Sequence, residues 1–218
     1  MITYTILIVF LVIIIFFTVH KKLKKRISKF PDLTNIIITL YTTFTGVFIA
    51  VDVTNYYEKQ TEKNNTIKNI DITTNRLTYG IMQAKMYLIL FQKDKDLCSS
   101  PKPITLPKIE FLNYFLSNEV TNRNLSQYGL EKILEVNDGF ELEIKQYQNN
   151  DSNNNGELIE KIRVILKIID YTTFFIKSLE LEKKWIQNEI SLNELKMRYD
   201  TLQHRLINDL NRKISKVE

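Results

Sequence analysis

The sequence predicts an all-α protein, in which an N-terminal two-helix transmembrane hairpin precedes a long-helix bundle with coiled-coil-like spacing. Two observations lead to this prediction. Two apolar stretches, 2–19 and 33–53, flank a short basic segment. Further along, apolar residues recur every three or four positions, which is the period of one face of a helix. We therefore expect two domains, 1–57 and 58–218, the second with a flexible Asn-rich loop at 149–156.

The first apolar stretch, 2–19, contains no charged residue. It is near the lower limit of length for a helix that crosses a hydrocarbon core of about 30 Å. The backbone must satisfy its own hydrogen bonds there, so a helix is expected. A cleaved secretory signal is the alternative. We favour a retained anchor, because no positive segment precedes the stretch and no A-x-A-like site follows it.

Segment 20–29 is basic, with six cationic residues and no acidic one. Short loops of this composition stay on the cytoplasmic side of a membrane. Clustered Lys and Arg beside a membrane helix are also attracted to anionic headgroups. The cationic residues are Lys21, Lys22, Lys24, Lys25, Arg26 and Lys29.

A turn at Pro31 and Asp32 is expected to lead into the second span, 33–53. Threonines dilute this stretch, and Asp52 lies at its end. Residues Thr42, Gly46 and Ala50 are spaced by four, so they line one face where helices approach closely. That face packs either on the first span or on a second chain.

Two spans and a cytoplasmic basic loop predict a multi-pass protein of the cell (inner) membrane. The bulk of the chain is then extracytoplasmic. It is cytoplasmic if the stretch 33–53 does not cross.

Charge and composition exclude several classes of function. Residues 54–218 hold 24 basic and 23 acidic side chains, without the concentrated basic face of a nucleic-acid binder. The single cysteine, Cys98, cannot form an intrachain disulfide or a cysteine-based metal site. The two histidines, His20 and His204, cannot form a multi-histidine site. We expect no metal and no cofactor. The carboxylates Glu180 and Glu182 are expected on a helix surface.

A long helix is expected over 54–97, and its second half carries a heptad of apolar residues. This heptad packs either inside its own bundle or between chains. Its members are Ile67, Ile70, Thr74, Leu77, Ile81, Ala84, Leu88 and Phe91.

Prolines in 98–107 end the long helix. Short helices are expected over 108–120 and 125–136, with a polar break at 121–124. The triplet Asn137-Asp138-Gly139 predicts a turn. The alternating stretch 140–148 fits a strand or a short helix equally well.

A second long helix is expected over 157–190, where its wide apolar face indicates packing on two sides. The pattern from Ser191 to Glu194 is a capping box that starts a last helix, reaching about residue 216.

One pair of residues on this last helix, Arg198 and His204, resembles the R-x(4–6)-H motif of HEPN domains. The resemblance covers these two residues and the fold class. It implies a small helical bundle that acts as a dimeric RNase, which requires a cytoplasmic location. Six residues along an ideal helix turn through about 240°, so the two side chains do not share a face.

We therefore expect a membrane-anchored, non-enzymatic helical protein that works through oligomerisation or partner binding, as a scaffold, sensor or accessory subunit. Its partners are the lipid bilayer and either a second copy or another protein that contacts the long helices. The alternative is a bacterial antiviral-defence effector that perturbs the membrane as an oligomer, or a HEPN-like RNase.

Overall fold

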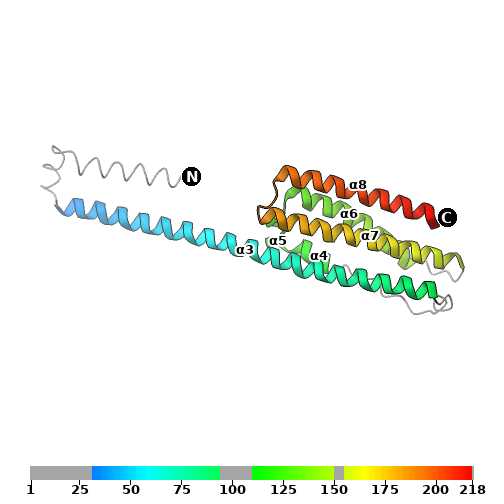
Figure 1. Cartoon of the computed structure of the whole chain (residues 1–218). Coiled ribbons are helices and arrows are strands. Elements are labelled where there is room, and N and C mark those ends of the chain that lie inside the picture. The colour runs from blue at the N-terminus through cyan, green and yellow to red at the C-terminus, as the bar shows by residue number, and fades with distance from the viewer. Residues whose placement is uncertain (1–30, 94–109, 150–154, 218) are drawn as a thin grey trace. The chain divides into compact units, whose positions relative to one another are not determined.

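The computed structural model describes residues 31–93, 110–149 and 155–217, and all its elements there are helices. This confirms the predicted all-helical fold class. The first expected span, the basic segment and the proline-rich segment lie outside the described residues. The helices, shown in Figure 1, are α3 (Pro31–Lys93), α4 (Glu110–Ser117), α5 (Glu119–Asn124), α6 (Gln127–Asn149), α7 (Asn155–Ile186) and α8 (Leu192–Val217).

The chain divides into two compact units, Met1–Gln60 and Thr61–Glu218, with the boundary inside α3. In the first unit, the turn predicted at Pro31 and Asp32 is wrong, because α3 begins at Pro31. Proline suits the first position of a helix, where its missing N–H would have no intrahelical partner. Within the described residues, we find no helix that is both long enough and apolar enough to cross a membrane.

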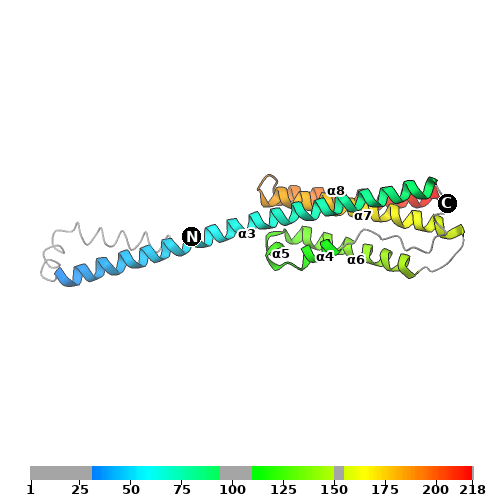
Figure 2. The ribbon, with the colours of Figure 1, turned by 90° about the horizontal axis from the view of Figure 1, so that it is seen from below.

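The second unit is built around α6, α7 and α8. Figures 1 and 2 show these helices side by side, with α7 antiparallel to the other two. Apolar side chains recur at helical spacing on their facing sides, so one continuous core forms between them. The main buried residues of this core are Ile133, Val136, Phe140, Val164, Ile168, Phe174, Phe175, Leu179, Leu195, Tyr199 and Leu206.

Beyond Thr61, α3 lies alongside α7 in both views (Figures 1 and 2). Three residues of the predicted heptad, Ile70, Leu77 and Ala84, are buried, and Ala84 packs with Ile165 and Ile169 of α7. At three other heptad positions, the buried residue is the one just before the predicted residue. Thr66, Thr73 and Gly80 are buried in place of Ile67, Thr74 and Ile81. These small residues therefore share with Ile70, Leu77 and Ala84 the face of α3 that is buried.

The polar break predicted at 121–124 is wrong, because these residues belong to α5. The helix begins where the Asn118 side chain accepts a hydrogen bond from the Thr121 N–H at 3.0 Å. Asparagine is a favoured N-cap because its oxygen satisfies a free backbone donor. Thr121 is buried and receives a side-chain hydrogen bond from Asn69 of α3 at 3.4 Å.

The turn predicted at 137–139 and the strand alternative for 140–148 are also wrong, because α6 continues through both. Ile133, Val136 and Phe140 are buried at spacings of three and four, and Asn137 is buried with them. Burial of this helical face outweighs the weak local preference of Asn, Asp and Gly for a turn.

The second long helix, α7, ends at Ile186, four residues earlier than predicted. Asn188 adopts a positive φ of 60°, which asparagine tolerates better than most residues. The Glu189 N–H bonds to the Lys184 carbonyl at 2.8 Å, and the Asn188 N–H bonds to the Trp185 carbonyl at 2.9 Å. This is a Schellman ending. As the capping box predicts, Ser191 Oγ then accepts from the Glu194 N–H at 3.2 Å at the start of α8.

Candidate functional site

Glu182 of α7 is fully buried, which corrects the prediction that it lies on a helix surface. Its carboxylate receives two hydrogen bonds from one residue. The Ser126 N–H donates to Oε2 and the Ser126 hydroxyl donates to Oε1, each at 2.7 Å. A buried carboxylate needs such donors, because an unpaired charge in the interior is strongly unfavourable. We call Glu182, Ser126, Gly129 and Tyr199 the carboxylate cluster.

Ser126 is also the N-cap of α6. Its hydroxyl oxygen accepts from the Gly129 N–H at 2.9 Å, and its carbonyl accepts from the Leu130 N–H at 3.0 Å. The positive end of the α6 dipole therefore points toward Glu182, which favours a negative charge there. One serine thus both starts α6 and attaches it to α7.

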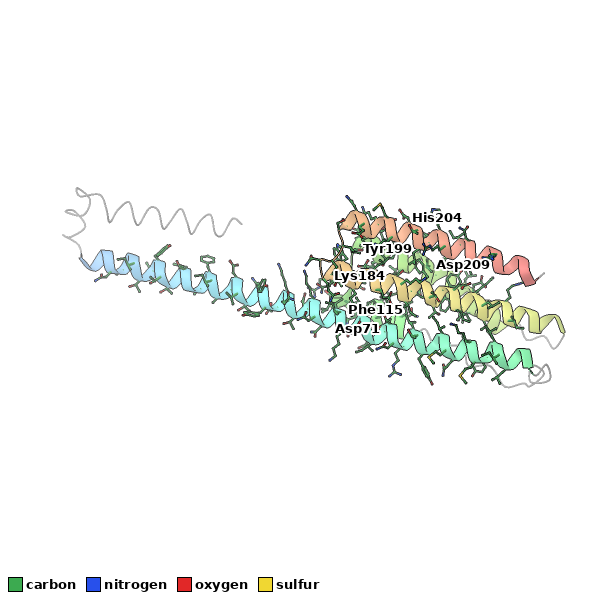
Figure 3. All side chains as sticks on the ribbon, in the orientation of Figure 1. Asp71, Phe115, Lys184, Tyr199, His204 and Asp209 are labelled. Atoms are coloured by element: carbon green, nitrogen blue, oxygen red, sulfur yellow. The ribbon has the colours of Figure 1, made fainter. Side chains whose placement is uncertain are left out.

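Tyr199 brings α8 into the cluster. It is fully buried, and its hydroxyl donates to the Ser178 carbonyl at 3.2 Å while also contacting the Glu182 carboxyl. Figure 3 shows Tyr199 on the inner side of α8, between that helix and α7. Burial raises the pKa of Glu182, while its hydrogen bonds with Ser126 and Tyr199 oppose this shift. Burial also raises the pKa of Tyr199 well above its ordinary range, and the Glu182 carboxylate adds to the effect.

Because Gly129 has no side chain, the Glu182 carboxyl group and the Tyr199 hydroxyl can lie directly against α6. A Cβ at this position would lie 2.7 Å from both Glu182 Cδ and Tyr199 Oη, and closer still to Glu182 Oε1. The carboxyl group is therefore packed by its own neighbours. The cluster is suited to holding α6, α7 and α8 in register, not to presenting a carboxylate to a substrate.

Sequence reasoning missed this cluster, although one signal was present. Glu182 lies three residues after Leu179 and seven after Phe175, so it belongs to the buried face of α7. A charged residue at a core position indicates a buried partner. The partner, Ser126, is 56 residues away in the chain, and no local pattern identifies it.

A second link between α6 and α8 lies at the surface beside the cluster. The Tyr128 hydroxyl donates to the Asp200 carboxylate, and this hydrogen bond raises the pKa of Tyr128 to about 12. The Tyr128 ring meets the Tyr199 ring edge-on at a centroid distance of 6.1 Å. Tyr199 therefore joins α8 to the buried cluster, and Tyr128 joins α6 to α8 at the surface.

The outer face of α3 carries a second heptad, on the side opposite to Ile70 and Leu77. We call it the outer stripe, and its spacing of seven, three, four and three positions is that of a coiled-coil face. These side chains are between 48% and 63% exposed. An ordered row of large apolar residues in water is typical of an interaction surface. The members of the outer stripe are Ile72, Tyr79, Met82, Met86 and Ile89.

The assembly residues predicted from the sequence lie in two settings. Ile70 and Leu77 are in the main core, and Ile67, Ile81 and Leu88 pack partly buried against the core clusters. Those five residues therefore face the chain's own bundle. Thr42, Gly46 and Ala50 are exposed, and among the described residues nothing lies within 4 Å of a Cβ built on Gly46.

The structure does not bring Arg198 and His204 together. Arg198 forms an ion pair with Glu194, one turn earlier on α8, at 2.6 Å. His204 is exposed on the outer side of the same helix, as Figure 3 shows. In the part of the chain that the structure describes, no group of three His, Cys, Asp or Glu residues could hold a metal ion.

Comparison with known proteins finds no counterpart: no family model matches the chain, and no curated protein or solved structure matches it significantly.

Proposed function

We propose that this chain is a membrane-anchored, non-enzymatic helical protein that acts through assembly, with the bundle as its interacting part. One observation carries the proposal: α3 exposes large apolar side chains along most of its length. They occur in two patterns, around the helix in 36–53 and as the outer stripe in 72–89. The first pattern suits lipid and the second suits another helix.

The membrane part of the proposal rests on the stretch 36–53 of α3. Its exposed large apolar residues are distributed around most of the helix, which is a pattern of helices surrounded by apolar material. They are Ile36, Ile38, Leu40, Phe44, Val47, Phe48, Ile49, Val51 and Val53. Although α3 does not reach the apolarity of a membrane-crossing helix, we propose from its exposed apolar side chains that this stretch and the segment 2–19 form the membrane hairpin, with the basic segment 20–29 between them.

Two further features fit an apolar surrounding. The Thr42 hydroxyl donates to the Ile38 and Thr39 carbonyls at 2.9 and 3.0 Å, so this polar group is satisfied without water. Exposed Tyr56 and Tyr57 lie three and four residues after Val53, where the apolar stretch ends. Tyrosine is enriched where a membrane meets water.

The assembly part of the proposal rests on the outer stripe. Fully burying a large apolar side chain stabilises by about 1.5–3 kcal/mol, so covering a half-exposed one contributes about 1 kcal/mol. Five such residues from each of two helices contribute about 10 kcal/mol in total. This is comparable with the association cost of roughly 4–15 kcal/mol, and a shared membrane lowers that cost. The carboxylate cluster does not support an enzymatic function, because its own side chains surround the Glu182 carboxyl group and leave no space for a substrate.

The test of the proposal uses the full chain with Cys98→Ser and one introduced thiol. Tyr114→Cys replaces a highly exposed residue of α4, and the matched control Ala84→Cys replaces a buried one. We expect the protein to stay with membranes through alkaline carbonate washing. An impermeant maleimide should label Tyr114→Cys, and not Ala84→Cys, in intact cells. Recovery in the soluble fraction would overturn the membrane proposal. Labelling only after permeabilisation would place the bundle in the cytoplasm.

A further inference from the structure

The outer stripe contains one polar position that constrains its partner. Between Ile72 and Tyr79, the heptad places exposed Asn75 at a contact position. The side-chain amide of an asparagine at a contact position can donate to and accept from the amide of a second asparagine, and only one register brings the two together. An apolar partner would instead leave the amide of Asn75 buried without a hydrogen bond.

We propose that a second copy of this chain covers the outer stripe, with the two α3 helices parallel and in register. This inference rests on the proposed function and names the partner in that assembly. In this arrangement, Ile72, Asn75, Tyr79, Met82, Met86 and Ile89 each meet the same residue of the second copy. Asn75 therefore faces Asn75. An antiparallel pair centred on the stripe would set Asn75 against Met86.

The charges beside the stripe favour the same arrangement. Ile72 and Asn75 are the two contact positions of the first heptad in the stripe. In a parallel pair, the residue just before the first contact position faces the residue that lies five positions further along in the second helix. Asp71 then faces Arg76 of the second copy, and the symmetry repeats this pair. Asp71 already accepts from Lys183 at 2.6 Å, yet its side chain stays 51% exposed. Its carboxylate has acceptor positions for a second donor. The antiparallel pair would place Arg76 near the neutral Gln83.

The proposed anchor supplies a further constraint. Two chains held by their N-terminal parts in one membrane start from the same side, so their α3 helices run in the same direction. Anchoring also raises the effective concentration of one α3 helix near the other, which favours a pair that is weak in free solution.

Cysteine cross-linking of the full chain tests orientation, in the Cys98→Ser background and in native membranes. Met86→Cys should form a disulfide dimer, because the two residues oppose each other in the parallel pair. The control Leu142→Cys introduces a thiol that is equally exposed but lies on α6, and it should stay monomeric. In the antiparallel pair, two Met86 positions are separated by about 16 Å along the axis. A dimer that forms only between Met86→Cys and Asn75→Cys chains would overturn the parallel arrangement.

A charge substitution tests the stripe itself. Met82→Glu should weaken dimerisation on the order of a hundredfold, because it sets two like charges against each other. Leu142→Glu should leave the mass in detergent unchanged. Both residues are exposed in the single chain, so both variants should keep the wild-type helical content in circular dichroism. A monomeric wild-type chain that remains in membranes would overturn the dimer alone. Loss from membranes would overturn the proposed function instead.

Discussion

Ser126 donates two hydrogen bonds of 2.7 Å to the buried carboxyl group of Glu182, one from its backbone and one from its hydroxyl. The same serine caps α6. The start of one helix and the buried side of another therefore depend on one contact between residues far apart in the sequence. Tyr199 adds α8 to this contact. The bundle is thus held in register by polar groups as well as by its apolar core.

Substitution of Gly129 by alanine should destabilise the bundle. The added Cβ would overlap the space of Glu182 and Tyr199, and overpacking of this kind costs about 1–3 kcal/mol. Gly139→Ala is the matched control on the same helix, since its Cβ would lie 3.6 Å from Tyr171 Oη, an ordinary contact. Alanine should stabilise there by up to about 1 kcal/mol, from helix propensity alone. Thermal unfolding of both variants, followed by circular dichroism in detergent, checks the prediction. Equal melting temperatures would contradict it.

Substitution of Glu182 by glutamine should both destabilise the protein and change its pH dependence. The side-chain amide has only one acceptor oxygen, so it cannot accept from both the Ser126 N–H and the Ser126 hydroxyl, and the loss of one partner costs about 1–3 kcal/mol. Burial raises the pKa of Glu182 above its ordinary value of 4.5, so the folded state binds this proton more tightly than the unfolded state does. The corresponding stability is present below pH 4.5 and is lost as pH rises through the raised pKa.

The stability difference between wild type and Glu182→Gln should therefore shrink as pH rises above 4.5. Denaturant unfolding at several pH values measures it, and the comparison cancels the titration of the other carboxylates. A difference that is constant, or that grows with pH, would show that the carboxyl group is not protonated preferentially in the folded state.

Enlarging Ala84 should loosen the packing of α3 on α7. Ala84 is buried against Ile165 and Ile169, so Ala84→Leu inserts side-chain atoms where the helices touch. We expect a loss of about 1–3 kcal/mol in unfolding free energy. Leu142→Met, exposed on α6 and outside the outer stripe, should change stability by less than about 0.5 kcal/mol. Hydrogen exchange should also accelerate in 70–90 for Ala84→Leu alone. Unchanged protection would mean that α3 is not held by this contact.

Removal of the Tyr128 hydroxyl tests the surface link between α6 and α8. Tyr128→Phe keeps the ring that packs on Tyr199 and loses the hydrogen bond to Asp200. We expect a cost of about 0.5–1.5 kcal/mol. A double-mutant cycle with Asp200→Asn isolates the pair, and Tyr114→Phe, at a highly exposed position, controls for loss of a hydroxyl. Additive effects of the two substitutions would show that the pair contributes nothing.

Helical periodicity alone determined the all-α fold class and most of the long helices. Leu195, Tyr199 and Leu206 of α8 are buried at spacings of four and seven, which keep them on one helix face, and Ser191 caps that helix as its local pattern indicates. These features depend on neighbours within one or two turns, so the linear sequence contains the information. The membrane anchor and the role in assembly also come from the sequence, and they remain predictions.

Tertiary packing decided the rest. The residues Asn137, Asp138 and Gly139 have a local preference for a turn, yet burial of Phe140 and Val136 keeps them in α6. Likewise, the local sequence predicts that Glu182 is a surface charge. It is buried because the fold brings Ser126 beside it from the start of α6. A local preference is worth about 1 kcal/mol or less, whereas burial of a single core side chain is worth more. Contacts between residues distant in the chain therefore determine where α6 continues, which carboxylate is buried and which face of α3 stays exposed.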